Sequence, residues 1–77
     1  MLDKNQVMKD SVRYFAELVM INDGEVKQGY KDSLKELINT IASKDFKLMD
    51  ECQQIIKDTV KEYEKQGFSV IDEKRYL

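Results

Sequence analysis

The chain uses one heptapeptide pattern three times. Each copy consists of Lys-Asp, Ser or Thr, an aliphatic residue, Lys or Arg, any residue and a large apolar residue. The copies are KDSVRYF at residues 9–15, KDSLKEL at 31–37 and KDTVKEY at 57–63. Around each copy the apolar residues recur at steps of four, three and four, which marks one face of a helix. The sequence therefore predicts three similar amphipathic helices.

Written in heptad positions, the apolar members of the repeat form a single seam that we expect to be the core. The seam consists of Met8, Val12, Phe15, Val19, Tyr30, Leu34, Leu37, Ile41, Ile56, Val60 and Tyr63. The Lys, Asp and Ser or Thr residues of the repeat are expected outside the seam or at its edge, so the repeat is interpreted as scaffolding. Gln53 also falls on the seam, where its amide either is buried and fixes the helix register or lies in water at the boundary.

Local capping signals set the expected boundaries of the first two helices. Asp3 is a candidate N-cap, and Gln6 three residues later completes a capping-box pattern. The Asn-Asp-Gly sequence at residues 22–24 is the clearest break in the chain. Because Gly29 costs about 1 kcal/mol in a helix interior, the second helix begins either directly after this break or later, with residues 24–29 irregular.

The third helix has signals at both ends. The polar connection at residues 43–45 offers two candidate caps, and Gly67 is the expected left-handed terminator. Phe68 then occupies the position from which a Schellman motif would fold it back against Tyr63. The expected helices cover about residues 4–21, 28–42 and 46–66, and residues 67–77 form a short extended tail.

Composition supports an all-α fold in one domain over residues 1–77. Proline and histidine are absent and only three glycines occur, so little interrupts a helix. We expect a three-helix bundle in up-down-up order. A chain of this length buries only about 60% of its unfolded surface, so its stability is marginal unless something else contributes. Self-association would supply such a contribution.

A second apolar stripe lies beside the seam in the first and third helices but not in the second. Its members, the candidate interface, are Val7, Tyr14, Leu18, Ile21, Leu48, Cys52 and Ile55. A large exposed apolar patch is unusual on a monomer, so we expect this surface to bind a second copy, as a homodimer, or another protein. The alternative is that three short helices cross steeply and bury these wide faces internally. The first functional hypothesis is therefore a small helical protein–protein interaction module, a regulator or an inhibitor.

Catalytic chemistry finds little support in the sequence. There is no histidine to pair with the single cysteine, Cys52, which is expected to be a small buried group. Gly24 and Gly29 are isolated and do not form a phosphate-binding loop. We expect no enzyme activity, no cofactor and no metal. A single cysteine, a charged N-terminus and the lack of a long apolar run favour a cytoplasmic protein without a membrane span.

A second hypothesis is a nucleic-acid-associated regulator. Its phosphate contacts would be Lys57, Lys61, Lys65, Lys74 and Arg75. The 13 basic and 15 acidic side chains give a net charge of −2, however, and nucleic-acid-binding domains are usually basic. Neighbouring Asp58, Glu62 and Glu64 favour a neutralised, solvated lysine face. The sequence therefore favours a protein partner over nucleic acid.

Two short segments are similar to motifs of known families. Asp-Gly-Glu-Val at residues 23–26 resembles the turn of tellurite-resistance-type helical domains. Asp32-Ser33-Leu34 resembles the attachment site of acyl carrier proteins, in which the serine opens an acidic helix. That resemblance implies a phosphopantetheine arm on Ser33 and a carrier role. The same Asp-Ser/Thr-aliphatic trio also begins at Asp10 and at Asp58, which favours a packing repeat instead.

Overall fold

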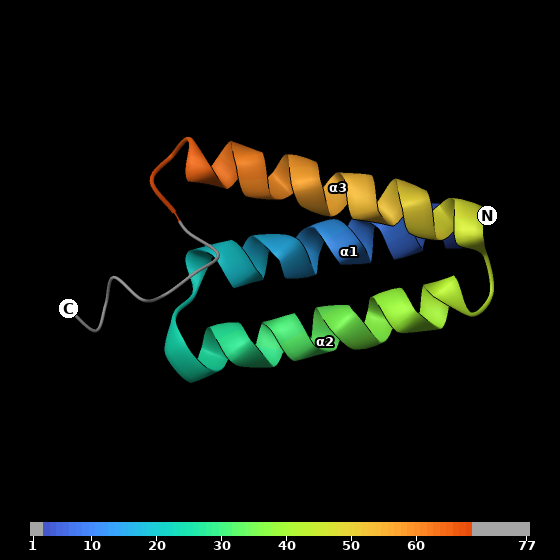
Figure 1. Ribbon diagram of the computed structural model, residues 1–77, viewed down its shortest axis with the longest axis horizontal. Helices are drawn as coiled ribbons and strands as arrows, with labels where there is room; N and C mark the ends of the chain where they lie inside the picture. The colour runs from blue at the N-terminus through green and yellow to red at the C-terminus, as the bar shows by residue number, and fades with distance from the viewer. Residues whose placement is uncertain (1–2, 69–77) are drawn as a thin grey trace.

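The computed structural model describes residues 3–68, and these residues form a three-helix bundle in up-down-up order (Figure 1). The helices are α1 (Lys4–Ile21), α2 (Gly24–Ala42) and α3 (Phe46–Glu64). The predicted all-α fold is thus confirmed. Most of the expected C-terminal tail, residues 69–77, lies outside the described residues.

The start of α1 is capped by Asp3, as the sequence predicts. The Asp3 carboxylate accepts hydrogen bonds from the backbone N–H groups of Asn5 at 3.0 Å and Gln6 at 3.4 Å. The reciprocal half of the capping box is not formed, because the Gln6 amide donates to Asp10 at 2.9 Å instead of returning to the cap. Asp3 alone therefore satisfies the side-chain part of this helix start.

The second helix begins earlier than residue 28. Gly24, with φ +56°, absorbs the change of direction after α1, and the helix runs without interruption from this residue. Asn22 ends α1 in an extended conformation, and its side-chain amide donates to the Leu18 carbonyl at 2.8 Å. Lys27 is only 1% exposed, so the first turn of α2 is part of the packed structure. We attribute the continuity through Gly29 to this packing, which outweighs the glycine's low helix propensity.

Both predicted caps of the third helix are present. The Asp45 carboxylate accepts from the N–H of Leu48 at 3.0 Å. Beyond Glu64, Gly67 has φ +96°, and the N–H of Phe68 donates to the Tyr63 carbonyl at 3.1 Å, which is the long bond of a Schellman motif. The Phe68 ring packs on Tyr63 with centroids 5.7 Å apart.

The first helix packs along both others, whereas α2 and α3 contact each other less. The buried apolar side chains are Val12, Ala16, Val19, Met20, Ile41, Leu48 and Cys52. From α3, the core thus receives Leu48 and Cys52 together with the fully buried Thr59. Both apolar residues belong to the second stripe of the sequence pattern, so α3 presents a different face to α1 than the seam indicates.

The predicted seam is only partly the core. Val12, Val19 and Ile41 are 0%, 4% and 2% exposed. The other seam residues are half-buried: Met8, Phe15, Tyr30, Leu34, Leu37, Ile56, Val60 and Tyr63. Gln53 is exposed, which matches the interpretation that its amide lies in water.

Polar contacts between α1 and α3 accompany this orientation of α3. Lys9 pairs with Glu51 at 2.8 Å, and the Arg13 guanidinium pairs with Glu62 through two contacts of 3.1 and 3.2 Å. Arg13 also donates to the Thr59 hydroxyl at 3.2 Å. These bonds require the edge of α3 that carries the two carboxylates to face α1, and they satisfy a threonine that the rotation buries.

Candidate functional site

An apolar groove lies between α2 and α3. Its volume is about 310 Å³. Ala16 and Val19 of α1 form its floor, and the other lining residues are Lys31, Leu34, Lys35, Ile38 and Asn39 of α2 and Ile56 and Val60 of α3. The groove exists because α1 holds the other two helices along its length (Figure 1), while the smaller contact between α2 and α3 leaves their facing surfaces partly uncovered.

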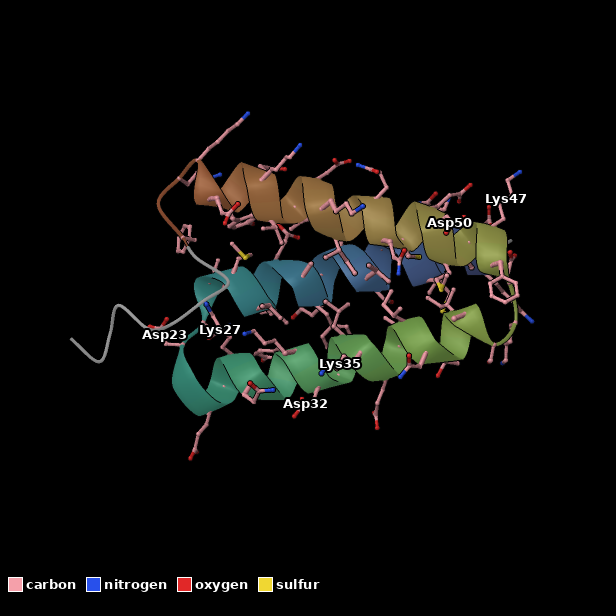
Figure 2. The ribbon with its side chains drawn as sticks, viewed as in Figure 1. Asp23, Lys27, Asp32, Lys35, Lys47 and Asp50 are labelled. Carbon is pink, nitrogen blue, oxygen red and sulfur yellow. The ribbon has the colours of Figure 1, made fainter. Side chains whose placement is uncertain are left out.

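The groove has a basic rim on α2. Lys31 is half-buried and Lys35 is exposed, and Figure 2 shows Lys35 midway along the helix. None of the lining residues is acidic, and neither lysine forms an ion pair with another described residue. The nearby Asp32 accepts a hydrogen bond from Gln28 at 3.0 Å. The groove therefore combines apolar walls with two positive charges.

The α1 half of the candidate interface remains on the surface. Val7, Tyr14 and Ile21 are 44%, 59% and 48% exposed, and Leu18 is half-buried. We call these four residues the α1 stripe. Tyr14 packs against Phe15 with ring centroids 5.9 Å apart, and Phe15 packs against Tyr30 of α2 at 6.3 Å. An aromatic row thus extends the stripe onto the second helix.

The α3 half of the candidate interface lies in the bundle. Leu48 is 7% exposed and Cys52 0% exposed, and Ile55 packs against the core in a half-buried position. Burial raises the pKa of the Cys52 thiol, which keeps the side chain in its weakly nucleophilic protonated form. The expectation of a small buried cysteine matches this placement, but the seven residues do not form one exposed surface.

Three pairs between α1 and α3 shift the pKa of one partner. The hydrogen bond from Lys9 to Glu51 raises the pKa of the lysine, and the bond from Arg13 to Glu62 raises that of the arginine. The Tyr63 hydroxyl donates to Glu17 at 2.6 Å, and this bond raises the tyrosine's pKa. Each partner stabilises the protonated form of the group, so these shifts describe structural pairs that hold α3 against α1.

A feature that the sequence pattern alone did not reveal is a glutamine three residues before each repeat. It donates its amide to the repeat's aspartate in all three helices: Gln6 to Asp10 at 2.9 Å, Gln28 to Asp32 at 3.0 Å and Gln54 to Asp58 at 2.9 Å. The constant position of this glutamine relative to the repeat is visible in the sequence and could have predicted the hydrogen bond. The repeat is thus longer than seven residues, and the aspartates are occupied in local helix contacts.

The remaining candidate residues that the structure describes lie on the surface. Lys57, Lys61 and Lys65 are exposed along α3, while Lys74 and Arg75 lie outside the described residues. Ser33 is exposed to solvent and lies in the middle of α2. It does not open a helix as the attachment serine does in the acyl-carrier resemblance.

No protein-family model, curated protein or solved structure matches this chain. Within residues 3–68, no cluster of three or more His, Cys, Asp or Glu side chains has an arrangement that could hold a metal ion. None of the helices in the same range is sufficiently long and apolar to span a bilayer. The geometry of the groove and of the α1 stripe therefore carries the functional argument.

Proposed function

We propose that the protein is a small helical protein–protein interaction module, a regulator or inhibitor, that self-associates through the α1 stripe. The observation that supports this proposal is the exposure of Val7, Tyr14 and Ile21, at 44%, 59% and 48%, on one side of a single helix. Such a set of large apolar side chains loses unfavourable contact with water when a second surface covers it.

A second copy of the chain is the proposed occupant of the α1 stripe. In a twofold dimer the same patch contributes from both subunits, so one apolar stripe supplies both halves of the interface. The aromatic row from Tyr14 to Tyr30 adds rings suited to the centre of such an interface. Dimerisation would also stabilise a domain of 77 residues. We place this activity in the cytoplasm, where a single unpaired cysteine such as Cys52 is usual.

The test is a matched pair of substitutions that introduce the same charge at two exposed aromatic positions. Tyr14→Glu alters the α1 stripe, and Phe46→Glu alters a residue of α3 that is 76% exposed and outside it. We expect wild type and Phe46→Glu to show a concentration-dependent dimer mass by light scattering, and Tyr14→Glu to remain monomeric with unchanged helicity by circular dichroism. A monomeric wild type at every concentration, or equal effects of both substitutions, would contradict self-association through this surface.

A second candidate function, nucleic-acid association, is favoured by one observation about α3. Two of the three carboxylates beside its lysine row have other contacts, because Asp58 accepts from Gln54 and Glu62 pairs with Arg13. Lys57, Lys61 and Lys65 are therefore less neutralised than the sequence suggests. Binding to duplex DNA that weakens steeply with added salt, and that Lys57→Gln with Lys61→Gln removes, would support this function. The absence of binding at low salt would exclude it.

A further inference from the structure

The first two copies of the repeat place basic residues at the same helical positions but in different surroundings. In α1 these residues are Lys9 and Arg13, and both form ion pairs with carboxylates of α3. In α2 they are Lys31 and Lys35, which line the groove. The same two positions of the repeat are therefore paired with a neighbouring helix in α1, whereas in α2 they border an open groove.

The equivalence follows from helix geometry. In each pair, the first basic residue lies three positions before an inward-facing aliphatic residue and the second lies one position after it. This aliphatic residue is Val12 in α1 and Leu34 in α2. The two pairs therefore lie on the same side of their respective apolar faces. On α1 that side receives α3. On α2 the same side borders the apolar groove, and no carboxylate is among the residues that line it.

We propose that the groove between α2 and α3 binds an amphipathic helix of a partner protein that carries carboxylates beside its apolar face. Lys31 and Lys35 are the ion-pair partners of those carboxylates. Helix α3 shows the required pattern: Glu51 and Glu62 lie about three turns apart along one edge of the helix and engage Lys9 and Arg13. A partner helix with this pattern would complete the basic positions of the second repeat as α3 completes those of the first.

The walls of the groove suit the apolar face of such a helix. Leu34 and Ile38 are one turn apart on α2, and Ile56 and Val60 are one turn apart on α3. The floor includes Ala16, whose small side chain leaves depth between the walls. A volume of about 310 Å³ accommodates anchoring side chains of a docked helix, spaced at three or four residues, and not the whole helix. Affinity would come from these anchors and orientation from the lysines.

This proposal concerns a different face from the α1 stripe, so the two can fail independently. The probe is a fluorescein-labelled synthetic peptide with the sequence of residues 46–64 and Cys52→Ser, which carries both template carboxylates. Its companion contains Glu51→Gln and Glu62→Gln. Fluorescence anisotropy measures the binding of each peptide to the full-length protein. We expect saturable binding of the acidic peptide, weaker binding of its companion, and loss of the difference at high salt.

The decisive protein variant is Lys31→Glu with Lys35→Glu. Its matched control is Lys44→Glu with Lys47→Glu, which makes the same charge change at two exposed lysines that do not line the groove. We expect the groove variant to bind about tenfold more weakly and the control to bind within about twofold of wild type. A peptide with Glu51→Lys and Glu62→Lys should recover binding to the groove variant.

Four outcomes would overturn the proposal. The first is the absence of saturable binding up to about 1 mM peptide, and the second is an equal loss in the groove variant and its control. The third is an affinity that follows Lys9→Glu and Arg13→Glu in place of the groove lysines, because the peptide would then be replacing the protein's own α3. If the groove variant instead changes the mass of the protein alone, the occupant is a second copy and the partner-helix proposal fails.

Discussion

Helices α1 and α3 carry the same second apolar stripe in sequence, but the fold uses the two stripes differently. In α3 the stripe supplies core residues, with Leu48 and Cys52 at 7% and 0% exposure. In α1 it remains largely exposed at Val7, Tyr14 and Ile21. The expected alternative, that wide apolar faces are consumed internally, therefore describes α3 and not α1. The apolar pattern alone does not determine which stripe is buried.

We infer from this difference that polar contacts contribute to how α3 is rotated about its axis. Helix α3 has two neighbouring apolar stripes, so more than one rotation about its axis would bury apolar side chains. The pairs Lys9–Glu51 and Arg13–Glu62 form only when one edge of α3 faces α1. The chosen rotation buries the second stripe and places Ile56 in the wall of the groove. The groove is thus a consequence of how α3 is oriented.

The largest expected effect comes from introducing one carboxylate into each stripe. Leu48→Glu buries an unpaired charge and should lower the free energy of unfolding by about 3–5 kcal/mol. Ile21→Glu places the same group on an exposed site and should change it by no more than about 0.5 kcal/mol. Urea denaturation followed by circular dichroism, at concentrations low enough to dissociate any dimer, measures both. Similar losses in the two variants would show that the stripes are not buried differently.

A smaller effect is expected from Thr59→Val, which tests the polar basis of the rotation. The Thr59 hydroxyl donates to the Ile55 carbonyl at 2.7 Å and accepts from Arg13, and the side chain is fully buried. Valine keeps the shape but removes both bonds, so we expect a loss of about 1 kcal/mol.

The matched control for this substitution is Thr40→Val. Thr40 makes the same kind of backbone bond, to the Glu36 carbonyl at 2.9 Å, at an exposed site without an arginine contact. Its loss should stay below about 0.5 kcal/mol. If Thr59→Val is as stable as wild type by urea denaturation, apolar packing and not hydrogen bonding sets the rotation of α3.

The fold could be predicted from local features of the sequence because those features act within one or two helical turns. The repeat period gives three helices, Asp3 and Asp45 cap two of them, and the glycine before Phe68 ends the third. Two boundaries differ from the prediction. The second helix starts earlier, since burial of its first turn, including Lys27, outweighs the glycine penalty. The third helix ends at Glu64 and not at about residue 66.

The candidate site was less predictable because it depends on contacts between distant residues. The heptad seam treats Ile56 and Val60 as core, whereas in the structure both are half-buried and line the groove, and Ile56 also packs against the core. Their position follows from the rotation of α3, which depends on long-range bonds such as that between Arg13 and Glu62. A periodic pattern identifies the apolar residues of a helix but does not choose between two adjacent faces.

The smallest effect that we predict is a pH dependence of the stability that the contacts between α1 and α3 contribute. The Tyr63 hydroxyl donates to Glu17, and this bond raises the pKa of Tyr63 above its ordinary value of 10.0. The bond therefore contributes its full stability below pH 10 and loses it as the pH rises through the higher folded-state pKa. The Tyr63→Phe variant keeps the ring but lacks the hydroxyl group that titrates. The urea midpoint of this variant should therefore fall less between pH 9 and pH 11 than that of wild type. Lys9, whose pKa is raised above 10.5 by Glu51, titrates in the same direction in both proteins, so the difference between the two curves isolates Tyr63. Parallel curves would show that the Tyr63–Glu17 bond does not help to hold α3 in its rotation.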